Sequence, residues 1–438
     1  MNKQKRVVAI LLTVSLMFVF IIITLSGCFF SFLEPQPAVK EYKTVSSIQD
    51  LMNMQEDGYY SLSADIDFEG ESWTAVSVKG FDGNGHTISN CIINVGVAFF
   101  DDVDSISDIT FDSIIVMAGK SICAGSVSQR IANVTVKNSQ LTVAGSGNIG
   151  IIAGSANNME NCEVVGCEIK CGLLKNSALI GGLAGSVDGE VDSCYLSDVD
   201  INAVHNSASD KSTFCVGGLI GKQLGGDVTE CSVSHAQIRV EATDEDSGVS
   251  IGGLIGYSEP SKVSYCFTED TTIEVSAQNE VRIGGLMGIT YSTISNSYTS
   301  NNTMSCIVGV AKNSYIGGFS ASAMEVTQSC FSANNCLIGK TPDDNVYVAG
   351  FCPNVQKAIN YCGVLDNTMT GTNIDEFAFE SDMIFNSFVT DTAQYVNVND
   401  LEAISSMDWF SPTIIAEKLK LSQSKWKFEV GQLPFLAF

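Results

Sequence analysis

The chain has 438 residues, enough for one large core or for several ordinary domains. Hydrophobic residues make up 45% and charged residues 16%, a balance that excludes a disordered tail and a coiled coil. The formal net charge of -26 predicts a surface that repels nucleic acid and anionic lipid headgroups. The 39 glycines against 7 prolines favour a fold with many tight, repeated turns.

The N-terminus has the parts of an export signal. Basic residues among the first six are followed by an apolar run over residues 7–25. The run ends in Leu-Ser-Gly-Cys, with the cysteine at Cys28, so small residues precede a cut site. We therefore predict a secretory signal peptide over residues 1–27.

The Leu-Ser-Gly-Cys segment resembles the lipobox of bacterial lipoproteins. The resemblance implies that Cys28 carries a diacylglycerol, becomes the new N-terminus and anchors the chain at the extracellular face of a bacterial membrane. Residues 28–60 would then supply the anchor, a linker and an N-terminal cap. One alternative stays open. The apolar run approaches the roughly 20 residues that cross a bilayer, so it can also remain as a transmembrane anchor.

A repeat built on two glycines governs most of the chain. Successive copies start 31 to 36 residues apart, which is typical of a solenoid. The four near-perfect copies are Ile180-Gly181-Gly182-Leu183-Ala184-Gly185, Val216-Gly217-Gly218-Leu219-Ile220-Gly221, Ile251-Gly252-Gly253-Leu254-Ile255-Gly256 and Ile283-Gly284-Gly285-Leu286-Met287-Gly288. The degenerate copies begin at Ile149, Ile316 and Val348.

Each unit has further apolar positions after its glycines. An apolar residue is followed three places later by a small or apolar one, as in Val191 and Cys194. A third apolar patch, such as Val199 and Ile201, closes many units. Apolar residues two apart indicate strands. We therefore predict three short strands per unit, which form one coil of a solenoid and bury their inward faces by stacking.

The Gly-Gly-Leu-x-Gly core resembles the GLUG repeat of large bacterial surface proteins, over about residues 95–365. We predict an all-β fold, a right-handed parallel β-helix (β-solenoid) over residues 61–365 with short capping elements at both ends. Residues 366–438 would form the C-terminal cap. Short helices are predicted near residues 46–52, with a capping box from Ser46 to Gln49, and near residues 399–404.

Most cysteines are predicted to be core residues. One repeat position is occupied by Cys91, Cys162, Cys194, Cys231, Cys266 and Cys362. Other units place Ile109, Val134 or Ser297 there, which indicates a cramped inward site where a free thiol acts as a small hydrophobe. Stacked coils lie about 4.8 Å apart, too far for easy bridging. The cysteines outside this frame are better candidates for a disulfide or two: Cys167, Cys171, Cys330 and Cys336.

No metal site, cofactor or catalytic motif stands out. Cys167 and Cys171 have no matching second pair, and the three histidines are scattered, so a zinc site is not predicted. The acidic run at residues 65–70 alternates with Ile66 and Phe68, which indicates a strand with these two side chains inward. The repeated glycines lack the helix and lysine of a phosphate-binding loop. We therefore predict no catalytic residue and no cofactor.

Aromatic residues flank the cysteine position. If the cysteines face inward, their neighbours face outward and form a strip across the coils. The strip consists of Tyr195, Tyr265, Phe267, Tyr298 and Tyr361. Aromatic faces and tyrosine hydroxyls suit sugar rings, so these are the candidate ligand-binding residues. The alternative is that long loops between the strands fold over the rings and bury them as a satellite cluster.

These patterns favour a lipid-anchored surface protein that binds an extracellular polysaccharide or another cell-surface component and does not catalyse a reaction. A carbohydrate-active enzyme, a polysaccharide lyase or hydrolase on the same scaffold, is the first alternative. A passive spacer is the second. The acidic charge argues against a nucleic-acid partner.

Overall fold

The computed structural model describes residues 40–207, 213–243, 248–309, 312–341, 345–378, 383–390, 401–422 and 424–437. The predicted signal peptide and Cys28 lie outside these residues. The chain divides into a unit over residues 1–42 and a unit over residues 43–438. Among the residues that the structure describes, no helix is both long and apolar enough to span a bilayer.

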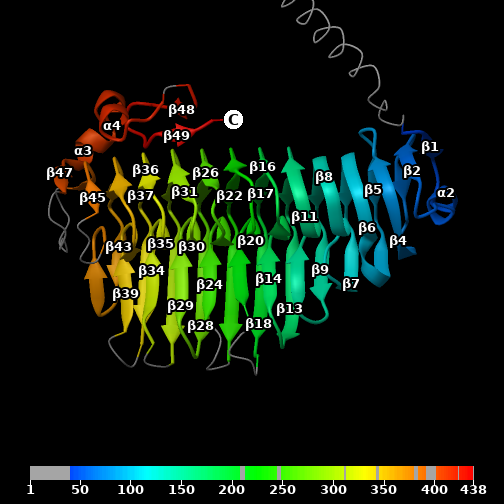
Figure 1. The fold of residues 1–438 in the computed structure, drawn as a ribbon, viewed down its shortest axis with the longest axis horizontal. Coiled ribbons are helices and arrows are strands. Elements are labelled where there is room, and N and C mark those ends of the chain that lie inside the picture. The colour runs from blue at the N-terminus through cyan, green and yellow to red at the C-terminus, as the bar shows by residue number, and fades with distance from the viewer. Residues whose placement is uncertain are drawn as a thin grey trace, which may run out of the picture. The chain divides into compact units, whose positions relative to one another are not determined.

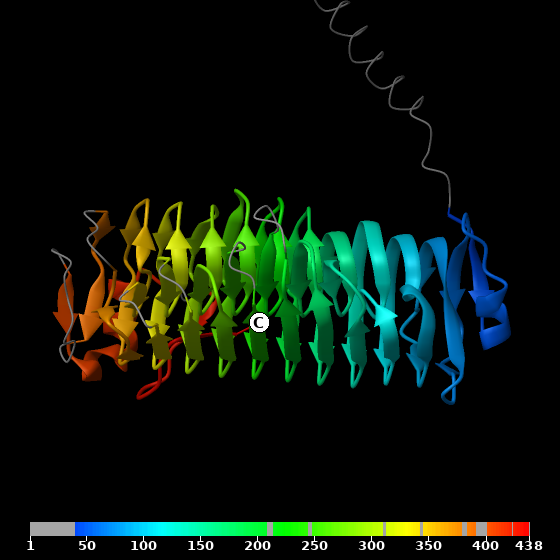
Figure 2. The same ribbon diagram turned by 90° about the horizontal axis from the view of Figure 1, so that it is seen from below.

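The described residues between 43 and 404 form a stack of coils whose strands pair in parallel from one coil to the next (Figure 1). Figure 2 shows that the coils follow one another in chain order along one axis. Between residues 178 and 205, all of which are described, one coil consists of β14 (Ala178–Gly181), β15 (Ala184–Val187), β16 (Val191–Asp192), β17 (Tyr195–Ser197) and β18 (Asp200–His205). Each strand pairs in register with its equivalent in the next coil. The predicted parallel β-helix is confirmed.

The five positions recur as five rows of strands. With β14, the first row comprises β10 (Gly147–Gly150), β19 (Phe214–Gly217), β24 (Val249–Gly252), β29 (Val281–Gly284), β34 (Ser314–Gly317), β39 (Val346–Ala349) and β44 (Asn373–Asp375). With β15, the second comprises β20 (Ile220–Gln223), β25 (Ile255–Ser258), β30 (Met287–Thr290), β35 (Ser320–Ala323) and β40 (Asn354–Val355). With β16, the third comprises β21 (Val228–Thr229), β26 (Lys262–Ser264), β31 (Thr293–Ser295), β36 (Thr327–Gln328), β41 (Ile359–Asn360) and β45 (Ile384–Phe385).

The fourth row contains β17 together with β12 (Glu163–Val165), β22 (Ser232–Ser234), β27 (Phe267–Glu269), β32 (Tyr298–Ser300), β37 (Phe331–Ala333), β42 (Gly363–Leu365), β46 (Phe388–Thr390) and β47 (Glu402–Ile404). The fifth row contains β18 together with β7 (Ile115–Gly119), β9 (Gln140–Val143), β13 (Glu168–Leu174), β23 (Gln237–Ala242), β28 (Thr272–Ala277), β33 (Thr303–Val308), β38 (Cys336–Lys340) and β43 (Thr368–Thr370). Near the start the rows merge into longer strands, which are β4 (Ser72–Asp82), β6 (Ile92–Asp112), β8 (Ala124–Lys137) and β11 (Ala153–Glu160), with β3 (Ile66–Asp67) and β5 (Thr87–Ser89) beside them.

The expectation of three strands per unit is therefore wrong, because single residues in the left-handed conformation divide each coil further. Ser193 (φ 52°) separates β16 from β17, and Asp198 (φ 53°) separates β17 from β18. One such residue bends the chain without a loop, so very short strands keep their pairing. Asn, Asp and Ser often accept this conformation, whereas bulky residues rarely do. The first of these turn positions is occupied in other coils by Asn161, Glu230, Tyr265, Asn296, Ser329 and Tyr361.

The core runs along the inside of the coils. In β18 the inward Ile201 and Ala203 are buried and alternate with half-buried polar residues, as a period of two requires. The glycines of the repeat permit the tight corner between the first and second rows. A Cβ added to Gly253 would overlap the carbonyl oxygen of Gly285 in the next coil, so only glycine fits there.

The N-terminal end carries β1 (Tyr42–Val45), helix α2 (Ile48–Met52) and β2 (Tyr59–Leu62). The predicted helix is confirmed, but its cap begins one residue later than predicted. The Ser47 hydroxyl accepts a hydrogen bond from the Asp50 amide at 3.2 Å, and the Asp50 carboxylate accepts from the Ser46 amide at 3.0 Å. Ile66 and Phe68 are buried, as the strand interpretation of the acidic run requires.

At the C-terminal end, parallel pairing continues past residue 365 through β43, β44, β45 and β46. The helix predicted near residues 399–404 is wrong, since Glu402–Ile404 is strand β47, which pairs with β46. Here, hydrogen bonding to the unpaired edge of β46 favours a strand more than the local capping pattern favours a helix. Helices α3 (Ser406–Trp409) and α4 (Pro412–Lys418) follow, and then the antiparallel pair β48 (Trp426–Lys427) and β49 (Phe435–Leu436). The described part of residues 405–437 is called the C-terminal cover below.

Candidate functional site

The five aromatic residues singled out from the sequence lie on several coils beside the cysteine position. Tyr195, Phe267 and Tyr298 belong to the fourth row of strands, whereas Tyr265 and Tyr361 occupy the left-handed turn just before that row. Phe267 and Tyr298 are register partners on adjacent coils. A serine lies between Tyr195 and Phe267 in the same row. The structure therefore joins Phe267 and Tyr298 and leaves Tyr195 apart.

Rings of this row stack face to face. The Phe267 and Tyr298 ring centroids are 4.9 Å apart with an interplanar angle of 5°, and those of Tyr298 and Phe331 are 5.0 Å apart at 8°. Tyr298, between the other two, thus has a neighbouring ring against each of its faces. A sugar ring needs an open aromatic face, so the interior of this stack offers only ring edges.

The C-terminal cover buries the stack. Trp426 packs 5.7 Å from both Tyr298 and Phe331, and Trp409 meets the edge of Phe331. Tyr298 is only 3% exposed, and burial raises the pKa of its hydroxyl well above the usual value. The expectation of an exposed strip is wrong for Tyr298. The alternative, burial in a satellite cluster, is confirmed there, but the covering segment is the C-terminal cover and not a loop between strands. Tyr265 and Phe267 are partly buried against the same cluster.

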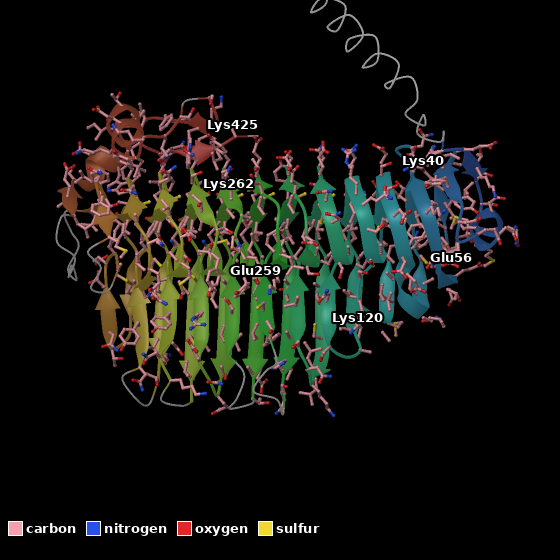
Figure 3. All side chains as sticks on the ribbon, in the orientation of Figure 1. Lys40, Glu56, Lys120, Glu259, Lys262 and Lys425 are labelled. Carbon is pink, nitrogen blue, oxygen red and sulfur yellow. The ribbon has the colours of Figure 1, made fainter. Side chains whose placement is uncertain are left out.

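The C-terminal cover contacts coils that lie far from it in the sequence. Figure 1 shows α4, β48 and β49 beside the ends of the third- and fourth-row strands, including β26, β31 and β36. Lys425 forms an ion pair with Glu230, which occupies a left-handed turn of a much earlier coil. Lys425 and Lys262 are labelled on this side in Figure 3. The apolar contact and the ion pair together keep the cover along the side of the stack.

One cavity of about 720 Å³ lies where the cover meets the last coils, and Tyr361 is part of its wall. Pockets for small ligands commonly have about this size. The lining residues are Tyr361, Phe385, Asn386, Ser387, Phe388, Glu402, Ile414, Glu417, Lys418 and Lys420. We call this cavity the C-terminal pocket.

The pocket combines open aromatic surface with paired charges. Phe385 is 45% exposed. The Lys418 ammonium lies 2.6 Å from a Glu402 carboxylate oxygen and 5.1 Å from the Phe388 ring centre, and the Lys420 ammonium lies 5.9 Å from the Tyr361 ring centre. Two lysines and two glutamates line the wall, so their charges balance. The wall therefore offers apolar faces, hydrogen-bond donors and hydrogen-bond acceptors, a set that suits an uncharged, hydroxyl-rich ligand.

Sequence reasoning identified only Tyr361 in this pocket. Phe385 and Ser387 fall in residues assigned from the sequence to the cap, although Asn386 repeats the left-handed position of Tyr361 one coil later. Extending the repeat frame past residue 365 would have found Phe385. Nothing in the frame indicates Glu402 or Lys418, because the cover brings them to the coil by folding back.

The cysteine row is confirmed as part of the core. Cys162, Cys194, Cys231 and Cys266 are buried on successive coils, and each sulfur lies near a backbone carbonyl two residues earlier. Burial raises the pKa of the Cys162, Cys194 and Cys231 thiols well above the usual value, and raises that of Cys91 to about 12. Raised pKa values make these cysteines poor nucleophiles.

The predicted disulfides among the remaining cysteines are not formed. All fourteen cysteines that the structure describes are free thiols. Cys330 belongs to the buried row after all, because Thr327 and Ile359 are register partners and place it directly below Cys362. Cys167, directly before β13, and Cys171, within β13, are buried, and Cys336 is half-buried. Within the described residues, no group of three or more His, Cys, Asp or Glu side chains is arranged to hold a metal ion.

With this geometry described, the comparisons with known proteins add one family match. Residues 212–235 match the GLUG motif. This segment contains the second near-perfect copy of the repeat, so the presence of the motif is confirmed there. The chain is also similar to the crystal structure of a candidate immunoglobulin A1 protease from Bacteroides ovatus, with 14% identity, a TM-score of 0.38 and coverage of 91% of this chain and 93% of that one. A second structure, an IgA1 protease, has 12% identity and a TM-score of 0.30, and the match covers 92% of this chain and 25% of that chain. No curated protein matches.

Proposed function

We propose that this chain is a lipid-anchored protein of a bacterial cell surface that binds an extracellular saccharide through the C-terminal pocket, without catalysis. The observation that carries the proposal is the open aromatic surface of Phe385 in a cavity that also contains the Glu402–Lys418 pair. An aromatic face beside fixed polar groups is the usual composition of a selective small-ligand site.

The saccharide class follows from the charges of the pocket. Two lysines and two glutamates line it, so an anionic or cationic ligand gains little from the local field. A hydroxyl-rich ring donates to the carboxylates, accepts from the ammonium groups and packs an apolar face on Phe385. The faces of the Tyr298 ring, by contrast, are already covered, so we propose the pocket in place of that row as the binding site.

We propose that the pocket does not catalyse a reaction because of the contact between Glu402 and Lys418. Both carboxylate oxygens of Glu402 are already engaged by the Lys418 ammonium, at 2.5 and 2.6 Å. Glycoside hydrolysis needs one carboxyl group that keeps its proton. The pocket is thus proposed to retain its ligand and release it unchanged.

The test uses the mature chain from Cys28, purified in detergent and incubated with a panel of polysaccharides. Retention and new reducing ends are measured together. We expect retention of at least one polysaccharide, no new ends, and weaker retention by Phe385→Ala. The matched control is Ile307→Ala, which removes an exposed apolar side chain from β33 and leaves the pocket intact. New reducing ends would establish an enzyme, and equal retention by both variants would remove the pocket from the proposal.

A further inference from the structure

A second uncovered aromatic surface runs along the corner between the first and second rows of strands. The corner is tight because the last glycine of each repeat lies against the backbone of an earlier coil. A Cβ on Gly256 would lie 2.7 Å from the carbonyl oxygen of Gly221 and 2.8 Å from the amide nitrogen of Val216. The outward side chains of the two rows therefore converge on one line.

Hydrogen bonds between the rows confirm that these side chains face each other. The Asn148 side chain, on β10, donates to the hydroxyl oxygens of Ser155 and Ser186, both at 2.8 Å. In these early coils the corner is closed by small polar residues. In later coils some of the equivalent positions carry longer side chains, and these line the corner: Lys222 and Tyr257 in the second row, and Arg282, Tyr315 and Tyr347 in the first.

On the second-row side, Tyr257 and its neighbours form an open cluster. The Lys222 ammonium lies 4.7 Å from the Tyr257 ring centre and 3.0 Å from a Glu259 carboxylate oxygen. The Tyr257 and Tyr291 ring centres are 5.8 Å apart with a tilt of 43°, and Tyr291 is 39% exposed. Because the two rings are tilted, they do not cover each other's faces as the rings of the Tyr298 row do.

The first-row side continues the groove toward the C-terminus. Tyr315 and Tyr347 stack at 5.5 Å, and Arg282 is the register partner of Tyr315 on the preceding coil. Arg282 forms an ion pair with Glu280. We call Lys222, Tyr257, Arg282, Tyr291, Tyr315 and Tyr347 together the corner groove. Each of its two cations has a carboxylate partner, so the groove has little net charge.

We propose that the corner groove binds a linear, uncharged polysaccharide whose chain runs along the stack of coils. The tilted Tyr257 and Tyr291 rings supply apolar faces, and the stacked Tyr315 and Tyr347 rings supply ring edges and hydroxyl groups. The two ion pairs supply donors and acceptors without selecting for charge. The whole chain, at -26, repels a polyanion. Equivalent positions recur about every 4.8 Å along the stack, which is close to the length of one sugar unit. Successive coils thus meet successive units of one polymer.

This site is independent of the C-terminal pocket, since it lies on other rows and shares no residue with it. It deepens the proposed function by naming the form of the saccharide. The probes are linear β-1,4-linked glucose and xylose oligosaccharides of increasing length, titrated into the mature chain by calorimetry. We expect affinity to rise with each added unit until the tyrosines are spanned, and then to level off.

The deciding variant is Tyr257→Ala with Tyr291→Ala, for which we expect about a tenfold loss of affinity for the long oligosaccharides. Tyr257→Phe with Tyr291→Phe keeps the rings and the packing, so it should retain most of the affinity. Phe385→Ala, in the pocket, should leave the length dependence unchanged. Loss of binding in Phe385→Ala alone would support the pocket and overturn the groove.

Three results overturn the inference. The first is binding that does not depend on oligosaccharide length. The second is equal affinity of the alanine and phenylalanine variants, which means that the rings do not contact the ligand. The third is tighter binding of linear polygalacturonate than of the neutral series, which would replace the uncharged class by an anionic one. Far-ultraviolet circular dichroism of each variant checks that the coils remain folded.

Discussion

Lys425 forms an ion pair with Glu230 across 195 residues of sequence. Glu230 occupies the left-handed turn before the cysteine row, and Lys425 directly precedes β48 in the C-terminal cover. The contact shows how the last part of the chain returns to a coil near the middle of the stack. The cover buries the aromatic row on the way, and its start forms one wall of the C-terminal pocket.

Trp426 should be the main contact of the cover. Its ring packs on Tyr298 and Phe331, so Trp426→Ala leaves a cavity in a buried aromatic cluster. We expect a loss of about 3 to 5 kcal/mol in the stability of the cover, as for other large-to-alanine changes in cores. Hydrogen exchange should become faster over residues 405–437 and stay unchanged in β18 and β23. Equal acceleration in the coils would mean that the cover and the stack unfold as one unit.

The ion pair between Lys425 and Glu230 should contribute little to the stability of the protein. Lys425 is 37% and Glu230 20% exposed in their side chains, so solvent screens their attraction. We expect Lys425→Met to change the free energy of unfolding by less than about 1 kcal/mol. Chemical denaturation with and without added salt measures this, with Lys427→Met as the control at an exposed position nearby. A larger loss for Lys425→Met would give the pair a greater role than its exposure suggests.

The repeat glycines should tolerate no side chain. A Cβ at Gly253 would overlap the backbone of Gly285, whereas a Cβ at Gly248 would have its nearest contact, the Glu280 carbonyl oxygen, at 3.8 Å. We therefore expect Gly253→Ala to lower stability by about 1 to 3 kcal/mol, as overpacking does. Gly248→Ala should be close to neutral. Thermal unfolding of the two variants side by side tests the difference, and similar melting temperatures would contradict the close packing of the coils.

The buried thiols should make the protein sensitive to alkali. Burial raises the pKa of Cys91 and Cys171 from 9.0 to about 12, so the folded state holds these protons more tightly than the unfolded state. Their contribution to stability is complete below pH 9 and is lost as the pH rises toward 12. Denaturant titrations from pH 8 to 11 should show falling stability. Cys171→Ala should reduce the loss of stability between pH 8 and 11. An unchanged dependence of stability on pH would rule out Cys171 as its cause.

Thiol reactivity gives a separate measurement on the same residues. Thirteen of the fourteen described cysteines are buried, and Cys336 is half-buried. In the native protein a thiol reagent should therefore modify Cys336 first and the others only on unfolding. Fast modification of Cys194 or Cys231 without denaturant would contradict the buried row. Cys336→Ser is the control that removes the early phase.

Cys28→Ser tests the anchor. If Cys28 carries the lipid, the serine variant should lose incorporation of labelled fatty acid and should keep its signal peptide. Mass spectrometry of the N-terminus and radiolabelling in a bacterial host measure the two effects. Retention of the label in the variant would place the lipid elsewhere, and an unprocessed wild-type chain without label would favour the transmembrane alternative.

The coil architecture was predictable because it is periodic. Each copy of Gly-Gly-Leu-x-Gly repeats the same corner, and inward residues such as Ile201 and Ala203 follow a period of two along their strand. The number of strands was not predictable from apolar spacing, because it depends on a single backbone angle at residues such as Ser193. Residues with small or acidic side chains enter the left-handed region without an obvious change in the apolar pattern.

The binding surfaces were only partly predictable. Proximity to the cysteine frame identified Tyr298 as outward, and it is outward from the coil. Outward does not mean exposed, however, because Trp426 covers it. The tyrosines of the corner groove, such as Tyr257 and Tyr315, occupy repeat positions that carry serine or cysteine in other coils, so no recurring aromatic drew attention to them.

The sequence by itself determined the parallel β-helix, the buried thiol row and the position of the repeat corners, since these follow from local periodicity and from the size of glycine. The tertiary structure decided which aromatic rings stay open. That outcome depends on the return of residues 405–437 to the side of the coils, where Lys425 meets Glu230 and Trp426 meets Tyr298. Contacts between segments so far apart have no period, and only the folded chain brings them together.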